Sequence, residues 1–317
     1  MRALVTLLKK DNTREKLLTY DWPEPANPKP TEVKTQTLFT GVTNGTERNH
    51  LVGGNYARSQ EELHIGPGYQ NIGQIIEVGS DVRNLKVGDL LYMSQDHLEY
   101  CLENTDGLHL KLPSEVDLKQ AALFGVSSVA MRCCRNADLR MGKRCLIVGA
   151  GLVGQMVAQI ANVMGACVTI CDINQDRLEI ARQIGAAEQA VDVSGDSWDR
   201  NIKEATYQVV IDVAGVVGME DKLIRATARR GTVLFIAGRF KVEYNFNLGQ
   251  GRDITIKQNG HFDNDDIANL CRLVTRGLVQ INPLIQDVLP INQADQFYRT
   301  LRDSPAELFG TVFDWRE

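Results

Sequence analysis

A glycine-rich segment near the middle of the chain has the residue spacing of a phosphate-binding loop. Gly149, Gly151 and Gly154 follow a short apolar run and precede a segment whose apolar residues recur at helical spacing. The first glycine permits a sharp turn, the second lets the backbone approach a pyrophosphate, and the third lets the helix pack closely on the sheet. The helix N-terminus offers free N–H groups to phosphate oxygens. The segment therefore predicts a dinucleotide site that includes Leu152 and Val153.

An acidic residue follows the next apolar run. Asp172 directly follows the segment 167–171, and its carboxylate there can accept hydrogen bonds from an adenosine ribose. A glycine-rich turn without a ligand would leave this acid unexplained. Its charge repels a 2′-phosphate, which favours NAD (or NADH) over NADP. Of its neighbours, Ile173 offers nothing to a phosphate, whereas Arg177 could bind one if it folded back, and could otherwise lie in solvent or against the adenine.

These residues need a sheet to hold them, and the chain from residue 143 onward alternates between strands and helices. The strands are expected at 145–148, 167–171, 208–212 and 232–236, each short and apolar, as in a parallel sheet covered on both faces. The pattern predicts an α/β fold with a Rossmann doubly wound sheet. Ligands bind such sheets at the carboxyl ends of the strands, which makes Ala214 and Gly238 further candidate cofactor contacts.

The remainder of the chain has a different pattern. Residues 1–125 are rich in short strands punctuated by glycine and proline, as in a rolled, largely antiparallel β domain. The segment 261–317 is too short for a domain of its own and is expected to return to the first one. We therefore expect a catalytic domain at 1–125, a nucleotide-binding domain at 126–260 and a return segment at 261–317.

Composition excludes several classes of function. The net charge of -5 gives no basic footprint for nucleic acid. No apolar run approaches the roughly 20 residues of a membrane span, and the N-terminus lacks the order of a signal peptide. The seven cysteines are odd in number, without a CxxC pair, and are typical of reduced core residues. We expect a cytoplasmic protein that binds a small molecule, with no nucleic-acid or membrane partner.

The order of these parts resembles the medium-chain dehydrogenase/reductase superfamily of alcohol dehydrogenase-like proteins over essentially the whole chain. The resemblance implies a β-rich, GroES-like catalytic domain, hydride transfer with a nicotinamide cofactor, and a homodimer paired through an edge strand, here expected at 242–246. It also implies that Val153 backs the nicotinamide ring and that Ser128 reaches the nicotinamide amide or ribose. The motifs that carry it are 41–47 (GVTNGTE), 67–70 (PGYQ), 73–79, 87–89 (VGD), 149–154, 172–178 and 211–215 (IDVAG).

The chain departs from the zinc-dependent members at each metal position. The place of the first cysteine ligand holds Thr43 and Asn44, the His-Glu pair is Tyr69-Gln70, and the third ligand's place is Phe124. Thiolate and imidazole ligands are therefore missing, and the four-cysteine structural lobe is missing too. The resemblance implies a zinc-free branch, similar in one motif and in its short length to bacteriochlorophyllide dehydrogenases. No metal is expected.

Without zinc, hydrogen-bond donors must stabilise the substrate oxygen. Tyr69 is the first candidate because it occupies a ligand's place, although it could merely fill the vacated metal site. Thr46 could pass the substrate proton on with His50 or the cofactor ribose, or could only cap a helix. Glu47 matches an acid that orients a neighbour, and Gln70 could donate an amide hydrogen bond to the substrate.

Three functions remain open from the sequence. The first is a zinc-independent, NAD-linked oxidoreductase for a secondary alcohol or ketone. The second is reduction of an activated C=C bond, as in quinone or enoyl reductases, which NADPH preference would favour. The third is an NAD-binding protein without turnover.

Overall fold

The computed structural model describes residues 1–316, which divide into two compact units. The β-rich unit comprises residues 1–125, 263–268 and 285–316, and the α/β unit comprises residues 126–262 and 269–284. The segment expected to return to the first domain is thus divided, because residues 269–284 pack with the α/β unit. The side chain of Gln159 holds that segment: its amide donates to the Gln280 carbonyl at 3.0 Å and accepts from the Gln280 N–H at 2.7 Å.

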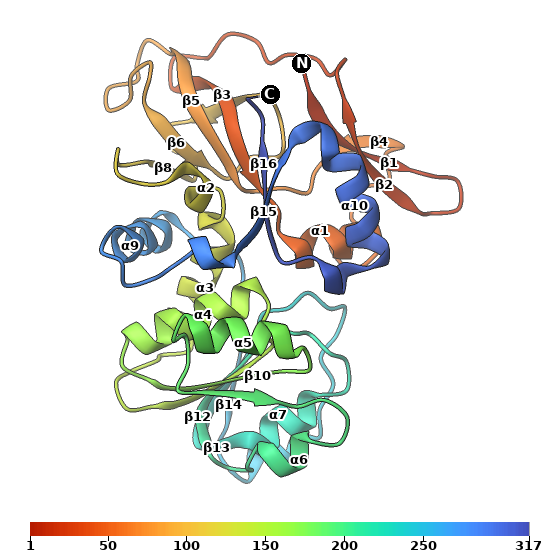
Figure 1. Ribbon diagram of the computed structural model, residues 1–317, viewed down its shortest axis with the longest axis vertical. Helices are drawn as coiled ribbons and strands as arrows, with labels where there is room; N and C mark the ends of the chain where they lie inside the picture. The colour runs from red at the N-terminus through yellow and green to blue at the C-terminus, as the bar shows by residue number, and fades with distance from the viewer. Residues whose placement is uncertain (317) are drawn as a thin grey trace. The chain divides into compact units, whose positions relative to one another are not determined.

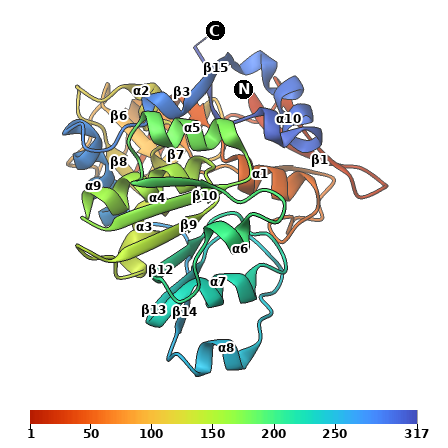
Figure 2. The same ribbon diagram turned by 60° about the horizontal axis from the view of Figure 1, so that its bottom comes forward.

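The α/β unit has a parallel sheet, formed in the described part of the chain in the order β11-β10-β9-β12-β13-β14. Helices α4 and α5 cover one face, and α6 and α7 cover the other (Figure 1, Figure 2). Apolar side chains of the second face, among them Trp198, Val210 and Leu223, form a continuous buried cluster. The doubly wound sheet predicted from the alternating pattern is confirmed. Its elements are α3 (Phe124–Asn136), β9 (Arg144–Val148), α4 (Leu152–Val163), β10 (Cys167–Asp172), α5 (Gln175–Gln183), β11 (Gln189–Asp192), α6 (Trp198–Asn201), β12 (Tyr207–Asp212), α7 (Glu220–Ala226), β13 (Thr227–Phe235), α8 (Phe246–Gln250), β14 (Thr255–Gln258), α9 (Asn264–Thr275, which continues from the β-rich unit) and the 3-10 turn η1 (Asn282–Leu284).

The β-rich unit contains, among the described residues, a sheet β2-β1-β4 and a sheet β15-β16-β3-β5-β6-β8 with β7 paired to β3. Helix α10, near the C-terminal end of the chain, lies beside α1 (Figure 1). Leu51, Phe297, Tyr298, Phe313 and Trp315 share one apolar cluster there. The elements are β1 (Ala3–Leu8), β2 (Arg14–Thr19), β3 (Glu32–Gly41), α1 (Asn44–Leu51), β4 (Leu63–Ile65), β5 (Asn71–Val78), β6 (Leu90–Met93), β7 (Tyr100–Asn104), β8 (His109–Lys111), α2 (Leu118–Ala121), β15 (Ile285–Pro290), η2 (Ile291–Gln293), α10 (Ala294–Asp303), η3 (Pro305–Glu307) and β16 (Gly310–Asp314).

One expected strand is wrong. Residues 242–245 form no strand, and Phe246 begins helix α8, whose N-cap Asn245 accepts a hydrogen bond from the Asn247 N–H at 3.3 Å. The family resemblance implied an edge strand there, but the asparagine cap begins a helix instead. The edge strands of the parallel sheet are β11 and β14.

Within residues 1–316 we find no helix that combines the length and the apolar character needed to cross a membrane.

Candidate active site

The glycine-rich loop connects β9 to α4 with the geometry that the glycine spacing predicts. Gly149 has a φ of +107°, in the region that favours glycine. A side chain at Gly154 would meet the Gly149 carbonyl oxygen at 1.8 Å, so only glycine allows this approach of helix and turn. At Gly151 a Cβ would meet nothing within 4 Å among the described residues, which leaves open space beside the backbone. Leu152 and Val153, in the first turn of α4, are half-buried. The loop therefore fits a pyrophosphate.

Asp172 lies at the end of β10, next to this loop. Its carboxylate accepts hydrogen bonds from the Ala150 N–H at 2.6 Å and from the Asn174 N–H at 2.9 Å. Asn174 caps α5 by accepting a hydrogen bond from the Arg177 N–H. Ile173, between Asp172 and Asn174, is 70% exposed. The carboxylate is thus fixed beside the glycine-rich loop and still half-exposed, as a ribose-binding acid requires.

The turn after β12 lies against the loop. A Cβ at Gly149 would contact the Ala214 N and Cβ at 3.1 Å. The Asp212 carboxylate shapes this turn by accepting from the N–H groups of Ala214 and Gly215 at 3.1 and 3.0 Å. Arg239, directly after Gly238, pairs with Asp212 and with Glu220. Asp212 and Arg239 were not predicted, because a buried ion pair between strand ends leaves no local sequence pattern.

Ser128, on α3 in the same unit, is fully buried, and its hydroxyl has no hydrogen-bond partner among residues 1–316. A buried hydroxyl without a partner costs free energy unless a ligand supplies one. This observation favours a polar ligand group beside Ser128.

In the β-rich unit, helix α1 carries three of the predicted residues. Thr46 is half-buried, Glu47 is 1% exposed and His50 is 3% exposed. Thr43 precedes the helix as its N-cap, and its N–H donates to the Glu47 carboxylate at 2.8 Å.

Glu47 is the centre of a buried polar cluster. Its carboxylate accepts from the Lys16 ammonium at 2.7 Å and from the Tyr298 hydroxyl at 2.6 Å, and lies 3.3 Å from the His97 Nε2. Burial alone would raise the pKa of Glu47, but Lys16 and His97 outweigh it and hold that pKa well below its ordinary value. Lys16 also donates to the Pro67 carbonyl at 2.7 Å. Glu47 therefore anchors α1 as an ionised, paired group.

Tyr69 lies in the loop between β4 and β5, at the position that the family resemblance assigns to a zinc ligand. Its hydroxyl interacts with the side chains of Thr43 and Thr46, so the predicted tyrosine and threonine do come together. Desolvation raises the pKa of the Tyr69 phenol well above its ordinary value. The phenol therefore stays protonated at neutral pH, which suits a hydrogen-bond donor better than a base. Gln70 is fully buried and donates to the Thr43 hydroxyl at 3.0 Å.

The donor set in this unit does not fit zinc. The three ligand places hold Thr43 with Asn44, Tyr69 with Gln70, and Phe124, which is fully buried. Throughout the described chain, residues 1–316, no three or more His, Cys, Asp or Glu side chains gather in a way that could hold a metal ion.

His50 contacts a second histidine that was not among the predicted site residues. Its Nε2 lies 3.2 Å from the Nε2 of His64 on β4, and the ring planes are 85° apart. Lys16, His64, His97 and Tyr298 all surround the predicted residues, yet they are distant from them in sequence. Only the pairing of strands β1, β2 and β4 with helices α1 and α10 brings them together.

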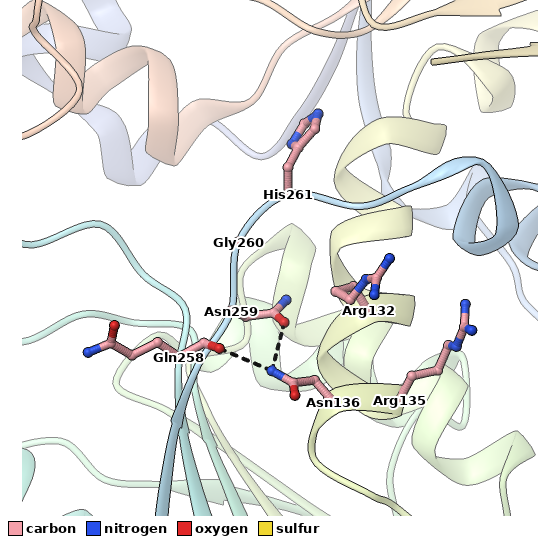
Figure 3. A pocket seen from close by; sticks show the side chains of 7 residues that line it. All are labelled: Arg132, Arg135, Asn136, Gln258, Asn259, Gly260 and His261. Atoms are coloured by element: carbon pink, nitrogen blue, oxygen red, sulfur yellow. Dashed lines mark hydrogen bonds between the residues drawn. The ribbon is translucent and has the colours of Figure 1, made fainter. Parts of the chain in front are cut away.

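The α/β unit also has an open polar hollow of about 470 Å³ beside the end of β14. Figure 3 shows Asn136 at its base, donating to the Gln258 carbonyl and to the Asn259 side chain, with the guanidinium groups of Arg132 and Arg135 above it. The glycine-rich loop does not line it. Its remaining lining residues are Gly260 and His261.

Comparison with known proteins supports the broader resemblance. A family model described as zinc-binding dehydrogenase matches residues 153–276. D-xylulose reductase of Saccharomyces cerevisiae is 23% identical over 329 aligned positions, covering 91% of this chain and 92% of that protein. D-guloside 3-dehydrogenase of Shigella flexneri is 30% identical over 204 positions, covering 62% of this chain and 56% of that protein.

Solved structures show the same fold. Galactitol-1-phosphate dehydrogenase from Escherichia coli has a TM-score of 0.85 at 17% identity, covering 99% of this chain and all of that one. The butanediol dehydrogenase of Bacillus subtilis has a TM-score of 0.82 at 19% identity, covering 99% of both chains. The chain thus has the same fold as these dehydrogenases. The matched segment 153–276 contains none of the zinc-ligand places. The narrower likeness to bacteriochlorophyllide dehydrogenases stays a prediction.

Proposed function

We propose that this relative of the zinc-type alcohol dehydrogenases is an NAD-dependent oxidoreductase that interconverts a secondary alcohol, such as a polyol, and its ketone without catalytic zinc. The observation that carries the proposal is the pairing of a cofactor loop that fits NAD with zinc-ligand places occupied by Thr43, Tyr69 and Phe124. The relatives named as xylulose, guloside, galactitol-phosphate and butanediol enzymes support the substrate class.

Each residue has its own role in the proposed reaction. Gly149 to Gly154 and Asp172 bind and orient the cofactor, and Ser128 offers its unpartnered hydroxyl to the nicotinamide end. When bound, NAD supplies the acceptor for the hydride. Tyr69 donates a hydrogen bond to the substrate oxygen, and Thr46 beside it passes the hydroxyl proton on. Glu47 is a positioning residue, since Lys16 and Tyr298 hold its carboxylate away from any substrate.

Activity after metal removal tests the central point. The purified chain is treated exhaustively with a chelator, its zinc content is measured, and oxidation of (2R,3R)-butane-2,3-diol with NAD⁺ and reduction of D-xylulose with NADH are followed. We expect full activity in the zinc-free protein. Loss of activity that zinc restores would overturn zinc independence, and a strong preference for NADPH would favour reduction of an activated C=C bond instead. NAD binding by calorimetry with no turnover in a broad alcohol and ketone screen would indicate a non-catalytic NAD-binding protein.

We further propose a cytoplasmic homodimer. The seven cysteines, all within residues 1–316, are free thiols and most are buried, which is consistent with a reducing compartment. Because the expected segment 242–246 contains no strand, we propose that the two copies pair through the edge strand β14 instead.

A further inference from the structure

We propose that Gln155 is a positioning residue for the cofactor, which aims the N–H of Gly151 at the pyrophosphate from the buried side of the glycine-rich loop. The proposal rests on the proposed function in one respect, namely that the ligand of this loop is NAD. Gln155 follows Gly154 in α4 and is fully buried. Its side chain therefore acts on the loop from within the α/β unit and does not touch the ligand.

The side-chain amide of Gln155 donates two hydrogen bonds to backbone carbonyl groups. Its Nε2 lies 3.2 Å from the Ala150 carbonyl oxygen and 2.7 Å from the Arg177 carbonyl oxygen. Because a carbonyl oxygen can only accept, both bonds need the NH2 end of the amide, which fixes the orientation of the side chain. The Oε1 of Gln155 is then buried where no group among residues 1–316 donates to it.

The unused oxygen of Gln155 argues against a role in packing alone. A buried acceptor without a donor costs free energy. A methionine, which is unbranched and apolar, would fill the same space without that cost. The use of an amide at this position therefore lies in the two carbonyl groups that it holds.

The hydrogen bond to Ala150 sets the direction of the next N–H group. The Ala150 carbonyl and the Gly151 N–H belong to one planar trans peptide unit, in which the two groups point in opposite directions. Since Gln155 draws the carbonyl into the protein, the Gly151 N–H points away from it, and the space beside Gly151 is open. Gly151 precedes the first residue of α4, so its N–H has no acceptor within that helix and is available to a phosphate oxygen.

Without Gln155 this peptide unit could turn over. Such a turn changes the ψ of Ala150 and the φ of Gly151, and glycine tolerates positive and negative φ about equally. The Ala150 carbonyl would then reach water in the space for the pyrophosphate, where its oxygen repels a phosphate. Gln155 thus decides which end of the peptide dipole faces the cofactor.

The hydrogen bond to Arg177 connects the glycine-rich loop with the ribose-binding acid. The Arg177 N–H, in the first turn of α5, donates to the side chain of Asn174 at 3.2 Å. The Asn174 N–H donates to Asp172, which also accepts from the Ala150 N–H. Gln155 closes this ring of hydrogen bonds. The groups proposed to bind the pyrophosphate and the ribose are therefore held in one fixed arrangement.

Calorimetric titration of Q155M with NAD and with ADP-ribose, which shares the pyrophosphate but lacks the nicotinamide, tests the effect on binding. We expect Q155M to bind both ligands at least about tenfold more weakly than the wild-type protein, because a hydrogen bond to a charged phosphate oxygen is lost. An affinity of Q155M for NAD equal to that of the wild-type protein would overturn the proposal.

The matched control is Q159M. Gln159 is a second buried glutamine of α4, and its amide exchanges two hydrogen bonds with the backbone of Gln280. Both variants lose two hydrogen bonds of a buried amide, so an effect of general destabilisation would appear in both. We expect Q159M to melt at a lower temperature than the wild-type protein and to bind both ligands equally well. A loss of NAD affinity in Q159M as large as that in Q155M would show that Gln155 has no special role.

Steady-state kinetics separate binding from chemistry. With (2R,3R)-butane-2,3-diol as substrate, Q155M should raise the KM for NAD⁺ and leave kcat at saturating NAD⁺ little changed, since Gln155 contacts no reacting atom. A fall in kcat with an unchanged KM would contradict a role in positioning the pyrophosphate.

Crystal structures test the orientation of the peptide unit itself. In the wild-type protein with NAD, we expect the Gly151 nitrogen within about 3.2 Å of a pyrophosphate oxygen and the Ala150 carbonyl bonded to Gln155. Without cofactor, we expect the same peptide orientation in the wild-type protein and a turned peptide in Q155M. A Gly151 N–H that faces away from the pyrophosphate, or an unturned peptide in Q155M, would refute the proposal. If the wild-type protein binds no NAD, the proposed function fails, while the cofactor-free structures still decide whether Gln155 sets the peptide.

Discussion

Asp172 shows how one side chain can combine a structural and a selective role. Its carboxylate joins the N–H of Ala150 in the glycine-rich loop to the N–H of Asn174 at the start of α5. The same charge stands where a 2′-phosphate would have to lie. Because two unit charges at 4 Å interact with about 1 to 4 kcal/mol between water and a protein surface, this one residue can set the cofactor preference.

D172N should therefore shift cofactor preference. The asparagine oxygen can still accept one hydrogen bond, but the repulsion is lost, so the ratio of kcat/KM for NAD⁺ to that for NADP⁺ should fall by about tenfold or more. Steady-state kinetics with both cofactors measure it. D176N removes a nearby exposed carboxylate and should leave the ratio unchanged. An equal ratio in D172N and the wild-type protein would show that the acid does not select.

Lys16 illustrates a residue whose importance the sequence conceals. It stands in a charged stretch that looks like a solvated strand, yet its ammonium is 1% exposed and holds Glu47 and the Pro67 carbonyl together. K16M would leave the Glu47 carboxylate buried without its partner. We expect the free energy of unfolding at pH 7 to fall by about 3 to 5 kcal/mol. K241M, which removes an exposed lysine, should change little in the same urea titration.

The effect of K16M on the free energy of unfolding should depend on pH. The pKa of Glu47 is lower in the folded protein than in the unfolded chain, so its stabilising contribution is complete above the ordinary value near 4.5 and is lost as the pH falls towards the folded value. K16M removes the main cause of that depression and leaves burial to raise the pKa of Glu47, so that in the variant the buried carboxyl takes up a proton, and loses its unpaired charge, as the pH falls to 4.5. The loss of stability in K16M should therefore be large at pH 7 and smaller at pH 4.5, and an equal loss at both values would contradict the ion-pair account.

At the scale of elements, one glycine of the loop before α4 is needed for packing, and another leaves space for a ligand. Gly154 and Gly151 are only three residues apart, but a Cβ at Gly154 would strike the Gly149 oxygen at 1.8 Å, whereas one at Gly151 would enter space that no described residue occupies. The two glycines therefore serve different purposes.

The matched variants G154A and G151A should show this difference. G154A forces α4 from the turn and should lower the free energy of unfolding by about 1 to 3 kcal/mol. G151A should melt like the wild-type protein yet bind NAD at least about tenfold more weakly, because its methyl group occupies the space for the pyrophosphate. Thermal melts and calorimetric titration with NAD measure the two effects. Equal affinity in G151A and the wild-type protein would show that no phosphate lies there.

Periodic elements were predictable and isolated partners were not. Short apolar runs bounded by glycine indicate the strands that end near Gly149 and Asp172. The α/β fold and the cofactor residues could therefore be predicted from local sequence. Helix α1 was not predicted as an element, since Asn44–Leu51 has a weak apolar pattern and is stabilised by the contacts of Glu47 with other segments. His64 and His97 were expected in the same domain as His50, but nothing in the sequence predicts that the side chain of His64 contacts that of His50.

At the scale of the whole molecule, the α/β unit leaves features that a second copy would cover. Strand β14 is an edge of the sheet with unpaired backbone groups, and the same unit exposes Val217 at 83%, Phe240 at 81% and Phe246 at 64%. Exposed aromatic side chains and open sheet edges are both costly in a soluble monomer.

We expect sedimentation equilibrium to give twice the 35.3 kDa mass of the chain. F240D should weaken the dimer, because association would bury its charge, whereas Y20D alters a tyrosine of the β-rich unit that is 63% exposed and should remain dimeric. A wild-type monomer, or dissociation by Y20D but not by F240D, would rule out pairing through the α/β unit.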